Sequence, residues 1–237
     1  MSENIKKITK AFKVDLDSRE NQSIILKPSA RPFNNQAHQV DKVAEKIAEK
    51  IYNLIEGAKH PNDDIILNHN KIKEAFFSPF KPQLKNAQVF LSHSHADKNK
   101  ALKVKNYLEE DLDAECVFID SLFWDYKDNI VKEMSKYDNT SKIEDAFTLI
   151  LRESLQDMIE KCPYFVFLQS NNSVSNQGLS RTTYSAWIYE ELKIAHSIRE
   201  SRLTPMMESM QVFHDISPFL ENLETITLKE LSQQINS

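Results

Sequence analysis

The chain has 237 residues, of which 41% are hydrophobic and 27% are charged, and its formal net charge is -5. This composition is typical of a globular protein with one medium-sized domain and an extension, or with two small domains. No basic stripe stands out, which disfavours nucleic-acid binding as the main function. No apolar run approaches the ~20 residues that span a bilayer, and the N-terminus lacks a signal-peptide core. We therefore expect a cytoplasmic protein without a membrane partner.

Cysteine and glycine are both rare, and this excludes several kinds of site. Cys116 and Cys162 lie in apolar segments and make neither a disulfide framework nor a zinc site. The two glycines are Gly57 and Gly178. A phosphate-binding P-loop and a dinucleotide-binding fingerprint each need several glycines close together. If the protein handles a nucleotide, it does so without a glycine-rich loop.

The N-terminal third differs in pattern from the rest. Residues 1–38 are polar and lack periodicity, which indicates an extended, flexible arm. Residues 40–56 carry apolar side chains at i, i+3 and i+4 spacing, which predicts an amphipathic helix that ends at Gly57. A shorter helix is expected over residues 71–77. Residues 1–84 are therefore predicted to be a mostly helical N-terminal extension.

From residue 85 onward the pattern alternates between strands and helices. Strands are expected over residues 88–92, 116–119 and 164–168, and helices over residues 98–110, 146–161 and 184–199. A polar loop is expected over residues 169–183. Two further strands, over 204–210 and 223–227, and a helix over 228–235 complete the chain. Strands that alternate with helices predict a parallel sheet covered on both faces, so residues 85–237 are predicted to form an α/β domain.

Polar residues follow the first and third predicted strands of this domain. Ligands of such sheets bind beyond the carboxyl ends of the strands, where the strand order reverses. In a flavodoxin-like order these ends are Ser92–His93 and Gln169–Ser170. Trp187 and Glu191, four residues apart, lie on one face of a helix that begins soon after the second of these ends. We expect the three segments to meet at one crevice.

Four short motifs, taken in order, resemble a TIR (Toll/interleukin-1 receptor-like) domain. They are Phe90-Leu-Ser-His, Val117-Phe-Ile-Asp120 with Trp124 in the next loop, Tyr164-Phe-Val-Phe-Leu-Gln-Ser170, and Trp187-x-x-x-Glu191. They are most similar to the bacterial TIR-like branch found in antiphage defence, including the NAD-processing component of Thoeris systems. The resemblance covers about Ala87–Ser237 and implies a five-stranded, parallel, flavodoxin-like sheet.

The resemblance implies an enzyme that cleaves the nicotinamide–ribose bond of NAD+, which is its substrate, with no separate cofactor and no metal. The product would be ADP-ribose or a cyclic or conjugated derivative. The catalytic glutamate of the family corresponds to Glu191 and not to Glu190. The residues expected to contact the substrate are Ser92, His93, Asp120, Trp124, Ser170 and Trp187.

The resemblance also implies partners. Residues 121–130 resemble the BB loop, which gates the site and mediates self-association. A downstream effector would be reached through a nucleotide signal, and a phage protein would act as the trigger.

One carboxylate is enough for this chemistry. The nicotinamide of NAD+ is already cationic and leaves as a neutral molecule, so the general acid that most glycosidases need is not required. A carboxylate aimed at the ribose stabilises the oxocarbenium-like transition state electrostatically.

Two other functions remain open at this point. His93-Ser-His-Ala-Asp97 also matches the start of a metallo-β-lactamase-type hydrolase, in which His93, His95 and Asp97 would bind zinc. Asp97 is otherwise expected to cap the helix that begins at Lys98. The second alternative is a non-catalytic TIR-like adaptor that acts through protein contacts of residues 40–57 and 121–130.

Overall fold

The structure is a computed structural model, and its described part is discontinuous. It comprises residues 10–27, 46–47, 49–54, 69–78, 86–112, 117–119, 129, 132, 141–177, 180–200 and 214–236. The chain divides into two compact units. Unit 1 comprises Met1–Pro32, Asn86–Asp120 and Gln156–Ser237, and unit 2 comprises Phe33–Lys85 and Ser121–Leu155.

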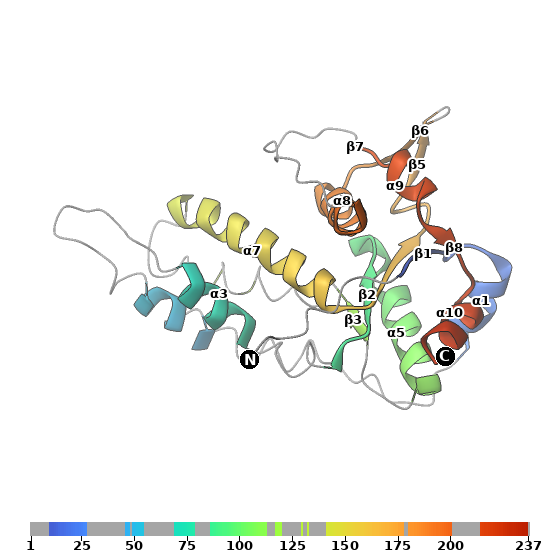
Figure 1. Ribbon diagram of the computed structural model, residues 1–237, viewed down its shortest axis with the longest axis horizontal. Coiled ribbons are helices and arrows are strands. Elements are labelled where there is room, and N and C mark those ends of the chain that lie inside the picture. Colours follow the sequence, from blue (N-terminus) through green and yellow to red (C-terminus); the bar gives the residue numbers. More distant parts are fainter. Residues whose placement is uncertain are drawn as a thin grey trace. The chain divides into compact units, whose positions relative to one another are not determined.

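Unit 1 is built on a five-stranded parallel sheet with the strand order β3-β2-β4-β1-β8 (Figure 1). The strands are β1 (Lys10–Asp15), β2 (Val89–Ser92), β3 (Val117–Ile119), β4 (Tyr164–Gln169) and β8 (Glu224–Thr225). This arrangement confirms the predicted α/β class with a flavodoxin-like parallel sheet. β3, β2 and β4 lie in the predicted order, and β1 occupies the fourth place, between β4 and β8.

The position of β1 corrects the prediction that residues 1–38 form an arm outside the sheet. Lys10–Asp15 pair in register with Tyr164–Gln169 of β4, and Phe12 and Val14 are buried. Lys13 breaks the apolar run that marks a strand covered on both faces. Its ammonium group donates to the carbonyl oxygen of Leu220 at 3.0 Å. Burial lowers the pKa of Lys13, as does the charge of Arg181, whereas Glu221 opposes this change.

Apolar side chains make the centre of the sheet. All four residues of β2 are buried, as are Phe165–Leu168 of β4. The Phe90 ring stacks on Phe165 and on Phe118 of β3, each at a centroid distance of 5.9 Å. These interlocked aromatic side chains fix the three neighbouring strands, and thereby the positions of the residues at their carboxyl ends.

Helices cover both faces of the sheet. α1 (Arg19–Ile25), α5 (Lys98–Leu112) and α10 (Leu228–Ile235) lie on one face, and α8 (Ala186–Glu200) lies on the other (Figure 1). Asn21 ties the N-terminal segment to the C-terminal one, because its side chain donates to Asp15 O at 2.7 Å and accepts from Leu228 N at 2.9 Å. Within the described ranges, no helix combines the length and apolarity needed to cross a membrane.

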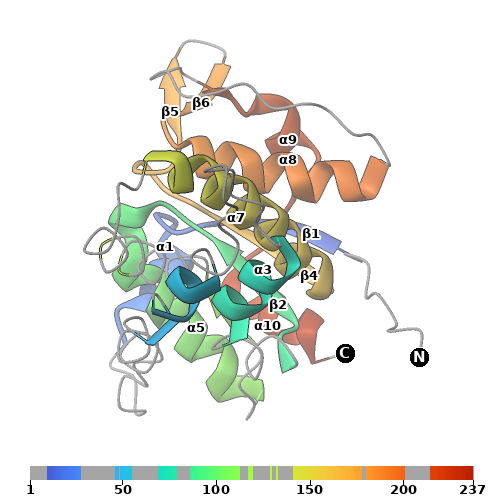
Figure 2. The ribbon, with the colours of Figure 1, turned by 90° about the vertical axis from the view of Figure 1, so that its left-hand side faces the viewer.

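The predicted polar loop over residues 169–183 contains two strands of a second, antiparallel sheet. Its strands are β5 (Ser175–Gln177), β6 (Ser180–Thr183) and β7 (His214–Asp215), in that order, and α9 (Ser217–Glu221) follows β7. Figure 2 shows this small sheet beside α8 and α9. Serine, threonine and asparagine dominate β5 and β6, and this composition indicates a loop when the sequence is read alone. The expected strand over residues 204–210 lies outside the described residues.

The described parts of unit 2 are helical. Residues 46–54, apart from residue 48, are helical, as predicted for residues 40–56. α3 (His69–Phe77) confirms the shorter predicted helix, and α7 (Ser141–Lys161) begins five residues earlier than expected. Lys73 of α3 lies 3.8 Å from Glu153 of α7, which forms an ion pair within this unit.

A buried ion pair on α5 holds the start of β3. Lys105 pairs with Glu109 one turn later, and both side chains are buried. The Lys105 ammonium donates to Val117 O at 2.9 Å, and Val117 N donates to Glu109 Oε1 at 3.1 Å. The pair therefore satisfies both backbone groups of the first residue of β3.

We expect Glu109→Ala to lower the free energy of unfolding by about 3–5 kcal/mol, because it leaves the buried Lys105 charge uncompensated. Urea unfolding measures the change. Glu110→Ala, which alters the next and exposed residue of α5, is the matched control and should change stability by less than about 0.5 kcal/mol. Equal stabilities of the two variants would show that the ion pair does not support the fold.

Candidate functional site

The central feature of the site is a contact between β2 and α8. Ser92 is the last residue of β2, and its hydroxyl donates a hydrogen bond of 2.5 Å to Glu191 Oε2. Neither side chain is exposed to solvent. The structure thus brings together two of the predicted site residues, which are 99 positions apart in the sequence.

The helix face explains why Glu191, and not its neighbour, reaches the strand. Trp187 lies one turn before Glu191 on α8 and is half-buried. Glu190 is also buried, but it forms an ion pair with Lys193 at 4.0 Å. Two adjacent glutamates on a helix point in directions about 100° apart, so one acid meets Ser92 while the other pairs with the next turn.

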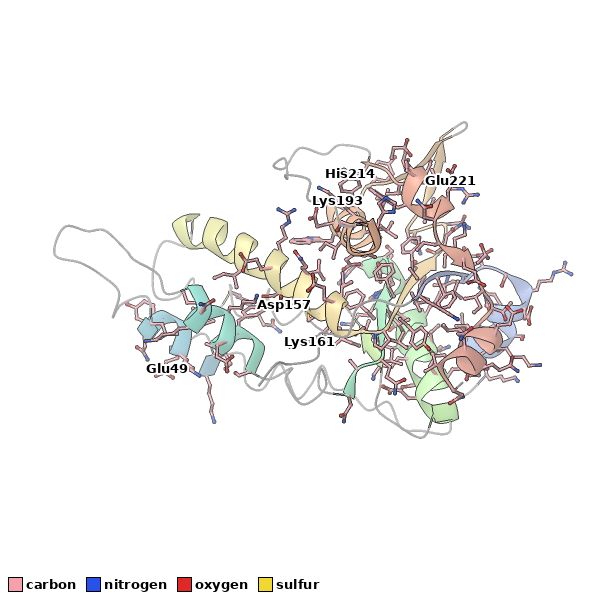
Figure 3. All side chains as sticks on the ribbon, viewed as in Figure 1. Glu49, Asp157, Lys161, Lys193, His214 and Glu221 are labelled. Carbon is pink, nitrogen blue, oxygen red and sulfur yellow. The ribbon has the colours of Figure 1, made fainter. Side chains whose placement is uncertain are left out.

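A different face of α8 is used for packing. The Tyr189 ring stacks on His214 at a centroid distance of 4.6 Å, and the Lys193 ammonium lies 5.8 Å from the Tyr189 ring. Lys193 of α8 and His214 of β7 lie close together (Figure 3). Tyr189 also packs edge-on against Phe219 of α9 at 5.6 Å. This face joins α8 to β7 and α9, which leaves the face of Glu191 for the sheet.

Ser170 belongs to a second polar cluster, centred on Asp97. Its hydroxyl donates to Asp97 Oδ2, and Asn172 Nδ2 donates to Asp97 Oδ1 at 2.9 Å. Asp97 is buried and ends a short 3-10 helix, η2 (His95–Asp97), after β2. The Asp97 carboxylate therefore holds the loop that follows β4 in place. The sequence predicts a different role for Asp97, as the cap of the helix that begins at Lys98.

Lys100 links this cluster to the N-terminal segment. Its ammonium lies 3.5 Å from Asp97 Oδ1 and 3.2 Å from Asp17 Oδ1, and Asp17 Oδ2 accepts from Asn171 N at 3.1 Å. Burial lowers the pKa of Lys100, but the hydrogen bonds and charges of Asp17 and Asp97 outweigh this effect and raise it. Lys100 therefore remains charged at neutral pH. Sequence reasoning missed Asp17, Lys100 and Asn171, because their meeting depends on the insertion of β1 into the sheet.

The remaining residues that were predicted to contact the substrate are His93, Asp120 and Trp124. His93 follows Ser92 at the carboxyl end of β2, and its side chain is buried. Asp120 and Trp124 lie outside the described residues, as does the loop over 121–128. The described site therefore consists of the Ser92–Glu191 pair, with Trp187 on the same helix and His93 on the same strand end.

The geometry gives no support to the zinc alternative. His95 is exposed, whereas His93 and Asp97 are buried. The oxygens of Asp97 accept from Ser170 and Asn172. In the part of the chain that the structure describes, no group of three or more His, Cys, Asp or Glu side chains is placed to hold a metal ion.

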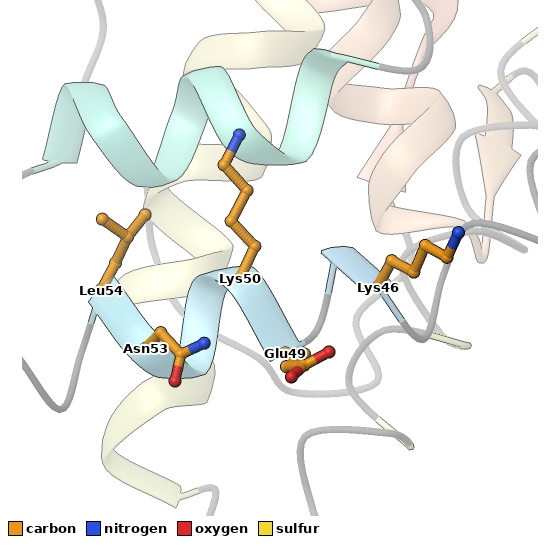
Figure 4. A pocket seen from close by; sticks show the side chains of 5 residues that line it. All are labelled: Lys46, Glu49, Lys50, Asn53 and Leu54. Atoms are coloured by element: carbon orange, nitrogen blue, oxygen red, sulfur yellow. The ribbon is translucent and has the colours of Figure 1, made fainter.

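A surface hollow of about 370 Å³ lies in unit 2 (Figure 4). Its lining residues are Lys46, Glu49, Lys50, Asn53 and Leu54. All five lie in the helical residues 46–47 and 49–54, and most are charged or polar. None of them belongs to the Ser92–Glu191 pair or to the Asp97 cluster, so the hollow is separate from the candidate site.

Comparison with protein-family models, with curated proteins and with solved structures found no match. A function for the chain therefore has to follow from the four motifs and from the geometry around Glu191.

Proposed function

We propose that the chain is a TIR-like enzyme that cleaves the nicotinamide–ribose bond of NAD+, with Glu191 as its catalytic carboxylate. The observation that carries this proposal is the buried hydrogen bond from Ser92 to Glu191 at the carboxyl end of the parallel sheet. Ligands of open α/β sheets bind at this edge. A carboxylate held in a site with little water interacts strongly with a nearby positive charge.

The chemistry needs a group that stabilises positive charge on the ribose. As the bond to nicotinamide breaks, charge moves from the ring to the sugar, and nicotinamide leaves as a neutral molecule. Glu191 faces this charge with a fixed carboxylate, so little reorganisation is needed in the transition state. Water, a hydroxyl of the same molecule or another acceptor then attacks the ribose and gives ADP-ribose, a cyclic isomer or a conjugate, and an attacking O–H group releases its proton to solvent.

Trp187 supplies an aromatic surface for the leaving group. It lies on the same helix face as Glu191, four residues earlier, and part of its side chain is exposed. A flat cationic ring stacks favourably on the face of a tryptophan. In this proposal nicotinamide departs along the Trp187 ring while the ribose stays beside Glu191.

The burial of Glu191 makes the activity conditional. Its side chain has no solvent exposure, so NAD+ reaches the carboxylate only after part of unit 1 has moved. We propose that a trigger, such as a phage protein, or self-association of the TIR-like unit opens the site. The nucleotide product then signals to a downstream effector in the cytoplasm, as part of antiphage immunity.

The test is nicotinamide release from NAD+. Wild-type protein and Glu191→Gln are incubated with NAD+, with and without phage lysates as triggers, and the products are analysed by mass spectrometry. Nicotinamide with ADP-ribose or an isomer is expected from triggered wild type and not from the variant. Equal release by both proteins would exclude Glu191 as the catalytic residue.

The complete burial of Glu191 also favours one other function, a non-catalytic adaptor, because a buried carboxylate can serve the fold alone. In an adaptor, the Ser92–Glu191 hydrogen bond would only fasten α8 to β2. An adaptor would release no nicotinamide under any trigger, and Glu191→Gln, which keeps the hydrogen bond from Ser92, would then alter partner binding alone. Pull-down from infected and uninfected cells, compared between wild type and Glu191→Gln, separates the two functions.

A further inference from the structure

We propose that Ser92 is a positioning residue, which holds the carboxylate of Glu191 in the orientation that the reaction requires. This inference rests on the proposed function and deepens it. Ser92 was expected to contact the substrate. Its hydroxyl instead donates to the catalytic carboxylate itself.

The hydrogen-bonding groups fix the direction of this contact. A serine hydroxyl has one proton to donate, and an ionised carboxylate only accepts. The proton of Ser92 is therefore committed to Glu191 Oε2, and the hydroxyl cannot donate to a substrate oxygen at the same time. The bond is buried, because neither Ser92 nor Glu191 is exposed to solvent.

The strand gives Ser92 a rigid base. β2 pairs with β3 on one side and with β4 on the other, and Ser92 itself lies opposite Phe167 of β4. The serine side chain has a single heavy-atom torsion, whereas glutamate has three. The Ser92 hydroxyl, on a central strand, therefore restrains the longer and more mobile side chain of Glu191 on α8.

This restraint matters because the position of the charge decides its effect. A carboxylate that rotates among several rotamers spends only part of its time facing the ribose. Held by Ser92, it is preorganised before the bond to nicotinamide breaks. We expect Ser92→Ala to lower kcat about 10- to 100-fold, and to change KM for NAD+ by less than about threefold.

Matched variants separate positioning from a general effect on the fold. Ser92→Thr keeps a hydroxyl on the same carbon and is expected to recover most of the lost kcat. Ser154→Ala removes another buried serine hydroxyl, which donates to Ile150 O at 2.5 Å on α7 and makes no contact with Glu191. It should leave kcat and KM unchanged. Circular dichroism and thermal unfolding confirm that each variant is folded.

A second measurement reports on the carboxylate without turnover. In protein labelled with carboxyl-13C glutamate, the Glu191 signal is the one missing from Glu191→Gln. Its chemical shift is expected to change in Ser92→Ala, to return toward the wild-type value in Ser92→Thr, and to stay constant in Ser154→Ala.

The possible outcomes are distinguishable. Wild-type kcat in Ser92→Ala would overturn the inference, while loss of activity in Glu191→Gln would still support the proposed function. An unchanged Glu191 signal in Ser92→Ala would also overturn it, whatever the activity. Absence of nicotinamide release from triggered wild type would refute the proposed function, and with it the role of Ser92 in catalysis.

Discussion

Deletion of residues 1–27 is expected to leave a protein that does not fold. The deletion removes β1, which lies between β4 and β8, and α1, which is tied to α10 through Asn21. It also removes Phe12, Val14 and Leu16 from the core, where each is at most 1% exposed. Each such side chain stabilises the fold by about 1.5–3 kcal/mol on burial, and a typical domain is stable by only about 5–15 kcal/mol.

Circular dichroism, urea unfolding and gel filtration test this expectation. The truncated protein should show no cooperative unfolding transition and should elute as an aggregate. Deletion of residues 1–9 is the control, because it leaves β1 complete. A soluble monomer of residues 28–237 with a cooperative transition would mean that the sheet is stable without its fourth strand.

Replacement of Glu191 by glutamine is expected to reduce nicotinamide release by at least about 100-fold, which is the usual effect of removing one preorganised electrostatic group. Glutamine has nearly the same volume as glutamate, and its carbonyl oxygen still accepts a hydrogen bond from Ser92. The charge opposite the ribose is lost, while the packing of α8 on β2 is kept. The loss should therefore appear in kcat, with an unchanged unfolding temperature.

Glu190→Gln is the matched control for this variant. Glu190 is the adjacent residue, it is also buried, and it lies near Lys193 instead of Ser92. Its replacement should leave the rate within a factor of about three of wild type, because it makes no contact with the reacting atoms in this proposal. Equal losses in the two variants would indicate damage to α8 and not the removal of a catalytic group.

The sequence predicted the parts of the fold that have strong local patterns. β2 and β4 are apolar runs, and α5 and α8 have helical periodicity, so their existence and order follow from single segments. The sequence also predicted that Ser92 and Glu191 lie at one edge of the sheet, since the ends of parallel strands and the following helix meet there, but it did not predict the hydrogen bond between them. That inference requires only that β2 and β4 are neighbouring, parallel strands.

The sequence did not predict β1, the small antiparallel sheet or the Asp97 cluster. Each of these features depends on at least one contact between residues that are far apart in the sequence. Lys13 interrupts the apolar run of β1, so the sequence does not indicate a buried strand there. The structure accommodates the Lys13 side chain because its ammonium group donates to the Leu220 carbonyl oxygen. β5 and β6 consist of polar residues, which acquire a strand conformation through the pairing of the two strands and the pairing of β6 with β7. The Asp97 cluster needs Asp17, which the sequence alone assigns to an arm. β5 and β6 are adjacent in the sequence, but β7, Leu220 and Asp17 are far from the residues that they contact.

The insertion of β1 between β4 and β8 also bears on how the chain acquires its structure during synthesis. Lys10 leaves the ribosome well before its partner, Tyr164, is made, and β8 is made later still. Until then the apolar side of β1 has no native neighbour and is available to other nascent chains or to chaperones. Pairing over such a distance also slows folding, because a long loop must close before the contact is gained. The protein should therefore refold slowly and should benefit from chaperones when it is overproduced.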